Sequence, residues 1–328
     1  MNLNFIDRIR QNYANPLDLF SYGIMGMNQR NVSYIGRYNK RRLYPLVDNK
    51  LKTKQMAIAH GVTTPTLLGA VKNQVDAQNI LEILGDHSEF CIKPAQGSGG
   101  KGILVITGRN GKYFTKASGQ EINIHDLRRH VSNILAGLFS LGGKQDIALI
   151  EDLIHFDQVF SGYSYEGVPD TRVIVFQGFP VMAMMRLSTA ASDGKANLHQ
   201  GAVGVGICIG TGRAVRAVQH NDVIEFHPDT DKDLYKLQVP HWDKVLSLAA
   251  SCYNMSGLGY IGTDIVLDRD KGPMLLELNA RPGLAIQTAN NAGLLPRLRL
   301  IEALPKRQSM SLEQRVAFSK QHFGVFKS

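Results

Sequence analysis

The sequence predicts an α+β protein built from short strands and separate helices, and three observations support this fold class. First, short β-branched runs recur between glycines, for example over residues 102–106. Second, two apolar runs, 171–177 and 181–186, flank a Gly and Pro turn and predict a hairpin. Third, apolar residues recur at helical spacing over 124–139 and 242–254.

The other elements follow along the chain. We expect an irregular segment up to about residue 45, and then a helix from Lys50 to His60 that is capped by Asp48. Further strands are predicted over 66–71, 89–93, 113–116, 147–153, 202–209, 214–218, 261–267 and 274–278, with helices over 77–84 and after Pro282. From Pro305 the chain is basic and weakly patterned, which indicates either a terminal helix or a partly mobile tail.

A chain of 328 residues exceeds a typical single domain, so we expect packed lobes that share clefts. We divide it into five segments. These are an N-terminal lead-in segment (1–45), a small α/β lobe (46–87), a lobe with a glycine-rich loop (88–155), a C-terminal lobe (156–304) and a basic C-terminal tail (305–328).

Composition narrows the class of protein. Hydrophobic residues make up 44% of the chain, which is typical of a soluble globular protein, and the net charge of +9 suits an anionic ligand. The cysteines Cys91, Cys208 and Cys252 are widely spaced and predict a reducing, cytoplasmic compartment. No apolar run reaches the roughly 18 residues of a membrane span, so we expect no membrane partner. Basic and aromatic residues do not interleave, so we expect no nucleic acid either.

A glycine-rich loop follows Lys93. The segment Gly97–Gly102 holds four glycines in six residues, which lets backbone N–H groups approach a polyphosphate closely. A dinucleotide-binding loop should open a helix, whereas a strand follows here at 103–106. A Walker A loop needs Ser or Thr after its lysine, and a protein kinase needs H-R-D and D-F-G motifs, which the sequence lacks. A hairpin loop without a ligand remains the alternative.

Three oxygen-bearing side chains lie on two neighbouring predicted strands. Glu277 and Asn279 are two residues apart and therefore project from the same face of one strand. Asp264 lies on the preceding strand, close enough through a short turn to meet them. Magnesium prefers such hard oxygen ligands, so this cluster predicts a metal site. The alternative is that the carboxylates pair with nearby arginines.

With a lysine before a glycine loop and a later D…E-x-N cluster, the sequence resembles the ATP-grasp superfamily, and within it the alpha-L-glutamate ligase-like proteins. The resemblance covers about residues 46–300. It implies a fold in which two α/β lobes grip ATP between them, here with a reduced N-terminal segment. The ATP-binding residues it implies are Lys50, Lys93, Gly97, Ser98, Gly99, Gly100, Lys101, Gly102, Glu151, Asp152, Leu153 and Asp170.

The resemblance also implies a role for each group. The two lysines would reach the ATP phosphates, the glycine loop would close over them, the 151–153 hinge would receive the adenine, and Asp170 would contact the ribose. The implied catalytic residues, which face the transferred phosphate and the substrate carboxylate, are Arg172, Arg186, Asn197, His199 and Arg281. The implied ligands of Mg²⁺, with Mn²⁺ as an alternative ion, are Asp264, Glu277 and Asn279.

The implied activity is an ADP-forming ligase: ATP phosphorylates a carboxylate, and an amine displaces phosphate from the acylphosphate to form an amide. Its substrates would be small-molecule or peptide carboxylates and amines, and a homo-oligomer remains open. Two differences from the glutamate ligases, a shorter segment before residue 46 and a longer aromatic-rich stretch at 155–169, fall where the acceptor should bind. The run Arg281–Gln287 also resembles ATP-grasp proteins linked to sugar-polymer or peptide tailoring. The alternatives are a kinase or a ligase with a non-amine acceptor, and a non-catalytic nucleotide-binding module.

Overall fold

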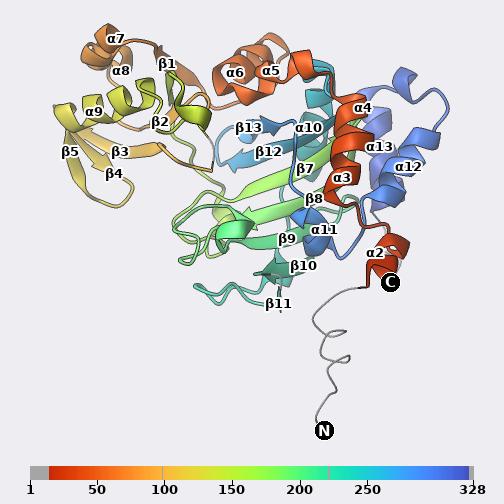
Figure 1. The fold of residues 1–328 in the computed structure, drawn as a ribbon. Coiled ribbons are helices and arrows are strands. Elements are labelled where there is room, and N and C mark those ends of the chain that lie inside the picture. The colour runs from red at the N-terminus through yellow and green to blue at the C-terminus, as the bar shows by residue number, and fades with distance from the viewer. Residues whose placement is uncertain (1–14, 98, 221, 325–328) are drawn as a thin grey trace.

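The structure is a computed structural model that describes residues 15–97, 99–220 and 222–324. It consists of two lobes, each built on one antiparallel sheet (Figure 1). The small-lobe sheet has the order β1-β6-β2-β3-β4-β5. Its strands are β1 (Leu67–Val71), β2 (Phe90–Pro94), β3 (Leu104–Asn110), β4 (Tyr113–Lys116), β5 (Glu121–Asn123) and β6 (Ala148–Glu151). The helices of this lobe are α7 (Gln74–Gln78), α8 (Ile80–Leu84) and α9 (Ile124–Leu135).

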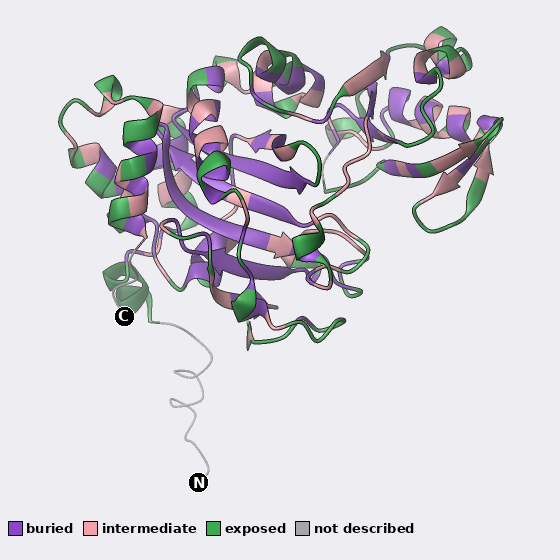
Figure 2. Cartoon of the chain, turned by 180° about the vertical axis from the view of Figure 1, so that it is seen from behind, coloured by how far each residue is buried: buried purple, intermediate pink, exposed green. Residues whose placement is uncertain are grey.

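The large-lobe sheet has the order β11-β10-β9-β8-β7-β12-β13. Its strands are β7 (Asp170–Phe176), β8 (Phe179–Leu187), β9 (Val203–Ile207), β10 (Ala214–Gln219), β11 (Asp222–Ile224), β12 (Tyr260–Asp268) and β13 (Gly272–Asn279). The helices are α10 (Trp242–Ser256), α11 (Ala285–Asn290), α12 (Leu295–Ala303) and α13 (Leu312–Phe323). Figure 2 shows that most of this sheet is buried, since α10 and α13 pack on its central strands and α11 packs on β8, β9 and β10. Together the two sheets and their helices confirm the predicted α+β class.

Packing explains why the small lobe folds as it does. Helix α9 begins with a capping box at Asn123 and buries Leu127, Val131 and Ile134, which lie three or four residues apart on one face. It ends at Leu135, four residues before the predicted end. Strand β1 pairs with β6, so a single sheet spans the predicted boundary between residues 87 and 88. The division of the chain into five segments remains a prediction.

The N-terminal segment is more ordered than we predicted. Within the part that the structure describes, it forms α2 (Pro16–Ser21), a helical run of α3 (Met27–Gln29), a π-helical stretch (Arg30–Ile35) and α4 (Gly36–Tyr38), a short 3-10 turn (Arg41–Leu43) and α5 (Pro45–Asp48). The prediction of an irregular segment was wrong because the rings of Tyr34 and Tyr38 pack edge-on against Phe176 of the large sheet, with centroids 5.6 and 4.8 Å away. This contact depends on residues far along the chain.

Two further details concern the cap of one helix and the C-terminal end of the chain. Helix α6 (Lys50–Ala59) is capped by Asn49, whose side chain accepts from the Lys52 amide, and not by Asp48 as predicted. At the other end, α13 confirms the terminal helix, one of our two alternatives. Among the described residues, no helix is both long and apolar enough to cross a membrane.

Candidate active site between the lobes

Two lysines and one glutamate form a buried ionic group where the helix Lys50–Ala59 (α6) meets the small-lobe sheet. Strands β2 and β6 are antiparallel neighbours in which Glu151 pairs with Cys91, so Lys93, two residues after Cys91, is a diagonal neighbour of Glu151 on the same face. The Lys93 Nζ lies 2.6 Å from one carboxylate oxygen of Glu151, and the Nζ of Lys54 lies 2.9 Å from the other. All three side chains are at most 7% exposed. Removing the Glu151 charge would leave two buried ammonium groups without their carboxylate partner.

Lys54 was missed in the sequence. It follows Lys50 by four residues on α6, so the two project from the same helical face, and this spacing was the available signal. Burial lowers the pKa of Lys54, although Glu151 opposes the shift. Burial also acts to lower the pKa of Lys93, but the attraction of Glu151 outweighs it, and the pKa of Lys93 is raised. Lys93 is therefore held as a cation at neutral pH.

The glycine-rich loop joins β2 to β3 and is held at both ends. A Cβ on Gly97 would lie 2.3 Å from the Pro94 ring, and one on Gly102 would lie 2.5 Å from the Phe139 ring. The Gly102 carbonyl also contacts Nε2 of His130 on α9 at 3.0 Å. Between these ends, a Cβ on Gly99 would meet nothing within 4 Å. The loop thus has fixed ends and an open middle, as a flap over a ligand requires. Of the predicted loop residues, Ser98 lies outside the described residues.

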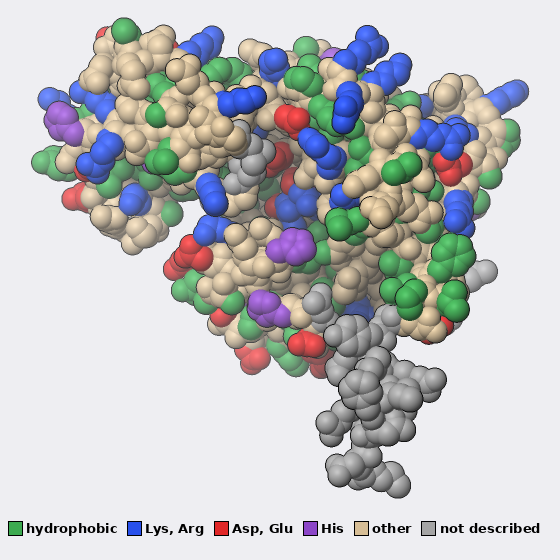
Figure 3. Space-filling view, viewed as in Figure 1, with side chains coloured by type: hydrophobic (Ala, Val, Ile, Leu, Met, Phe, Trp, Pro, Cys, Tyr) green, Lys and Arg blue, Asp and Glu red, His purple; other side chains and the backbone are tan. Residues whose placement is uncertain are grey.

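Lys50 connects this loop to the large lobe. Its Nζ donates to the Gly97 carbonyl at 2.7 Å and lies 3.4 Å from a carboxylate oxygen of Glu277 on β13. The predicted phosphate lysine, loop and metal ligand therefore meet at one place. Figure 3 shows a hollow between the lobes in which Lys and Arg side chains lie together with Asp and Glu side chains.

Four charged residues form a second ionic group on the large sheet. Arg172 pairs with Asp264 through two hydrogen bonds of 2.7 and 2.6 Å, and Arg186 pairs with Asp170 through two of 2.6 Å. A contact of 2.9 Å between Arg186 and Asp264 joins the pairs. Such bidentate pairs fix the planes of both guanidinium groups. These two ion pairs follow from the strand register, since Asp264 lies opposite Arg172 and Asp170 lies opposite Arg186 on neighbouring strands.

The pKa values of the two aspartates are shifted in opposite directions. Burial acts to raise the pKa of Asp264, but Arg172 and Arg186 outweigh it and hold the pKa at about 2. For Asp170, burial raises the pKa to about 6, because its main attraction comes from Arg186 and the Asp264 charge repels it. Both Asp170 oxygens already accept hydrogen bonds from Arg186, so a contact with a ribose, as predicted, remains a prediction.

The predicted metal ligands lie together. Asp264 pairs directly with Glu277 across β12 and β13, and Asn279 follows Glu277 on the same face. The Asp264 carboxylate accepts from two arginines, but its Oδ1 accepts only one of these bonds and keeps a lone pair for an ion. The Asn279 Oδ1 accepts from the Arg281 amide. Two carboxylates and an amide oxygen fit Mg²⁺ in chemistry, with phosphate oxygens completing its shell.

Among the described residues there is no group of three or more His, Cys, Asp and Glu side chains that could hold a metal ion. A metal at this place would therefore depend on the amide of Asn279 and on ligands from a nucleotide. Such partial protein ligation is usual for Mg²⁺ in phosphoryl-transfer sites.

The other predicted residues lie around this centre. In the segment predicted to be the hinge, Asp152 pairs with Lys271 at 2.9 Å, and its neighbour Leu153 lines a small pocket beside it. Asn197 caps a short 3-10 turn (Leu198–Gln200) and accepts from the amide of His199, whose side chain is exposed. The Lys195 stem lies 3.9 Å from a Cβ built on Gly100, so this segment faces the open part of the loop.

Arg281 points elsewhere. Its guanidinium lies 5.3 Å from the Tyr44 ring centroid and 3.8 Å from Asp48, and the side chain is 58% exposed. It is thus not part of the Arg172–Asp264 group in this structure, and a role in holding a carboxylate remains a prediction.

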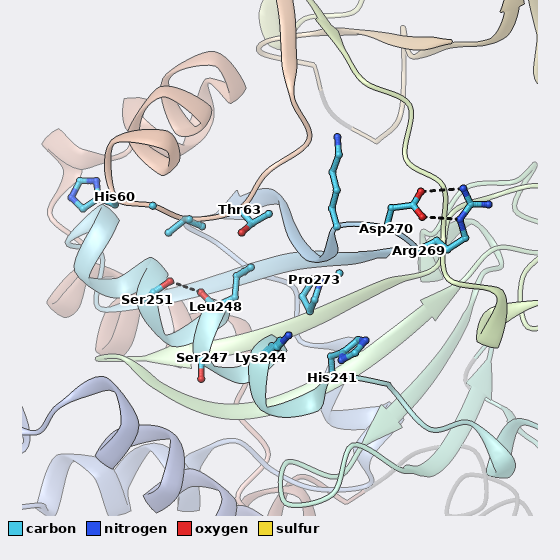
Figure 4. A pocket seen from close by; sticks show the side chains of 14 residues that line it. His60, Thr63, His241, Lys244, Ser247, Leu248, Ser251, Arg269, Asp270 and Pro273 are labelled. Carbon is cyan, nitrogen blue, oxygen red and sulfur yellow. Dashed lines mark hydrogen bonds and ion pairs between the residues drawn. The ribbon is translucent and has the colours of Figure 1, made fainter.

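One further pocket contains none of the predicted site residues. It lies between the end of α6, helix α10 and the β12–β13 turn, and Figure 4 shows His60, Lys244 and His241 around it. Its Arg269 is already paired with Asp270 at 3.0 Å.

Solved structures similar to this chain include the ATP-grasp ligase PsnB in complex with a minimal precursor (15% identity, TM-score 0.43). The match covers 81% of this chain and 62% of PsnB, so the chain spans less than two thirds of that ligase. The D-cycloserine synthetase DcsG is also similar (18% identity, TM-score 0.45, covering 80% of this chain and 72% of that one). So is D-alanyl-alanine synthetase A from Vibrio cholerae (10% identity, TM-score 0.45, 85% and 66%).

No curated protein matches the sequence. The family model described as sugar-transfer associated ATP-grasp matches residues 29–303, which is most of the chain. The matched region contains both ionic groups, the glycine-rich loop and the predicted metal ligands. The chain therefore belongs to the sugar-transfer associated ATP-grasp family.

Proposed function

We propose that this protein is an ATP- and Mg²⁺-dependent ligase that activates a carboxylate as an acylphosphate and joins it to an amine. The position of Lys50 carries the proposal. One ammonium group contacts the glycine loop of the small lobe and the Glu277 carboxylate of the large lobe. A polyphosphate between these two elements would meet the cations and the metal-binding oxygens together.

Each charged group would have a separate role in this site. Lys50 would pair with the phosphates, and Lys93, which Glu151 keeps charged, would add a second cation behind the loop. When bound at Asp264, Glu277 and Asn279, Mg²⁺ would neutralise charge on the phosphate oxygens. The loop amides would complete the cradle and exclude water from the reacting phosphate.

Arg172 and Arg186 would hold the reacting carboxylate and its phosphorylated form. Each uses Nε and one terminal nitrogen for its aspartate, and the other terminal nitrogen has no hydrogen bond among the described residues. A planar donor that is already fixed by a second carboxylate loses little entropy when it binds a ligand. This supports recognition of a carboxylate as the group that ATP activates, as in a glutamate ligase-like enzyme.

A kinase with the same fold is the second candidate, because Lys50, Lys93 and the loop would serve both reactions. The two differ in their products. We would incubate the protein with Mg²⁺, ATP and mixtures of amino acids, short peptides and sugar acids, with and without amines, and measure ADP release and product mass.

A ligase releases ADP only when an acid is present and forms a mass equal to acid plus amine minus water. A stable phosphorylated product would favour the kinase. Acid-dependent ADP release should disappear in Glu277→Ala and persist in Glu225→Ala, an equal charge change at a residue outside the site. ADP release that needs no acid, or that survives Glu277→Ala, would contradict the proposal.

A further inference from the structure

A second pocket lies beside the candidate active site, at the N-terminal segment. Its volume is about 870 Å³, which is within the range of small-molecule sites. Apolar side chains of the N-terminal segment, including Leu19, Tyr22 and Met27, form one wall. These are 39%, 72% and 67% exposed, so a ligand would cover apolar surface that the fold leaves in water.

The ionisable side chains among the polar residues of this pocket are basic. They include Arg30, Arg216 and His199, and no Asp or Glu is among the lining residues of the pocket. Arg30 already donates to the Pro282 carbonyl and to Asn31. Arg216 differs, because within the described part of the chain its guanidinium has no hydrogen bond or ion pair and its Nε is buried without a partner. A buried, unpaired N–H group costs stability, and a ligand oxygen would remove that cost.

Strand register relates Arg216 to the active site. Arg216 pairs with Gly206 on β9, Gly206 with Met184 on β8, and Met184 with Arg172 on β7. Directly paired residues share a face of the sheet, so Arg216 and Arg172 lie on the same face. They are three strand spacings apart, which is roughly 14 Å.

The pocket also approaches the predicted site along the chain. Gly283, which lines it, lies four residues after Asn279, and His199 lies two residues after Asn197. Both predicted catalytic segments thus end in the pocket wall. A ligand in the pocket would therefore contact the ends of segments that lead to the predicted site, although Arg216 itself is roughly 14 Å from Arg172.

We propose that this pocket binds the non-nucleotide substrate through a carboxylate held by Arg216, with an apolar or ring-shaped body against the N-terminal wall. Because Arg216 is roughly 14 Å from Arg172, this carboxylate is not the one that becomes activated. The substrate therefore carries a second anionic group. The identity of the ligand as a substrate rests on the proposed ligase function, whereas the anion site itself does not.

Binding can be measured without activity, because Met27 lines the pocket. We would label methionine methyl groups with ¹³C, assign Met27 with Met27→Leu, and titrate phenylacetate, indole-3-acetate and D-glucuronate. Each acid is matched by its uncharged amide. We expect the acids to shift the Met27 methyl signal saturably and the signal of Met56, outside the pocket, to stay unchanged. The amides should bind roughly 10- to 100-fold more weakly, as expected for one charged hydrogen-bonded contact.

Arg216→Gln should weaken binding of the acids by a similar roughly 10- to 100-fold factor. Its Tm should stay equal or rise, because the change removes an unpaired buried N–H group. Arg213→Gln is the matched control. It removes the same charge just before β10, where the Arg213 guanidinium bonds to Gln238 and does not line the pocket.

Three results would overturn the proposal: no acid shifts Met27, acid and amide bind equally, or Arg213→Gln weakens binding as much as Arg216→Gln. The comparison of acid with amide uses the wild-type protein, so it holds even if a variant misfolds. Binding of Mg²⁺ with a nonhydrolysable ATP analogue is measured on the same sample. If the acids bind but the nucleotide analogue does not, the ligase function is rejected. If the nucleotide analogue binds but the acids do not, the anion site is rejected.

Discussion

Replacing Glu151 by Gln should destabilise the small lobe strongly. The substitution keeps the shape of the side chain and removes the carboxylate that pairs with both Lys54 and Lys93, at 2.9 and 2.6 Å. These side chains are 5% and 7% exposed, so water screens them little. An uncompensated buried charge costs about 3–5 kcal/mol. Lys54, whose pKa burial already lowers, would then give up its proton most easily.

Asp152→Asn is the matched control, because it makes the same charge change one residue later. Asp152 pairs with Lys271 in a contact where the two side chains are 29% and 42% exposed. A pair of that exposure contributes at most about 1 kcal/mol. The double variant Lys54→Met/Glu151→Gln should recover part of the loss, since it removes one of the two unpaired ammonium groups.

Urea unfolding measures these differences for both lobes. Far-ultraviolet circular dichroism reports the whole chain, whereas Trp242, the single tryptophan, reports the large lobe. In Glu151→Gln we expect an early dichroism transition that precedes the Trp242 transition. Equal losses below about 1 kcal/mol in Glu151→Gln and Asp152→Asn would refute the buried ionic group.

Three further predictions concern the nucleotide site. Glu277→Ala should lower Mg²⁺-dependent turnover by about 100-fold or more with the dichroism spectrum unchanged, because even outer metal partners contribute about 10–100-fold; near-normal turnover would remove Glu277 from the metal site. Lys93→Ala should weaken ATP binding in calorimetry, whereas Lys112→Ala, an equal charge loss on an exposed turn, should not, and equal affinities would place Lys93 outside the site. Gly102→Ala should lower Tm more than Gly99→Ala, since both have positive φ but only Gly102 lacks room for a Cβ; equal Tm values would show that the loop is not fixed at Phe139.

Much of the fold was predictable because its signals are local. The Gln177–Gly178 turn joins β7 to β8 as a hairpin, and alternation along β13 placed Glu277 and Asn279 on one face. The pairing of Asp264 with Glu277 followed from the short β12–β13 turn. In each case the deciding residues lie on one strand or on two consecutive strands, so a single sequence was sufficient.

The parts that were missed depend on contacts between distant segments. The helical run at 27–38 forms where Tyr34 and Tyr38 reach Phe176, more than a hundred residues later. Likewise, the sequence did not predict that the Glu151 carboxylate pairs with Lys54 and Lys93. No local pattern reveals which distant charge a buried carboxylate will meet.

The pairing of arginines with the predicted metal ligand was a different case. We had considered that Asp264 pairs with arginines instead of a metal, and the structure shows the pairing with Arg172 and Arg186. The register of three strands brings these residues together. The pairing leaves a lone pair on Asp264, so the alternatives that the sequence left open are compatible in one site.

Amide hydrogen exchange of Gly97–Gly102, with and without Mg²⁺ and a nonhydrolysable ATP analogue, tests the central claim most directly. That claim is that a nucleotide lies between the lobes with its phosphates under this loop. Among the described residues, a Cβ on Gly99 would meet nothing within 4 Å, so we predict fast exchange in the free protein and slow exchange with the nucleotide. The exposed β3–β4 turn at Lys112, which lies outside the predicted nucleotide site, should exchange equally in both states. Equal protection of the loop with and without nucleotide would contradict the account.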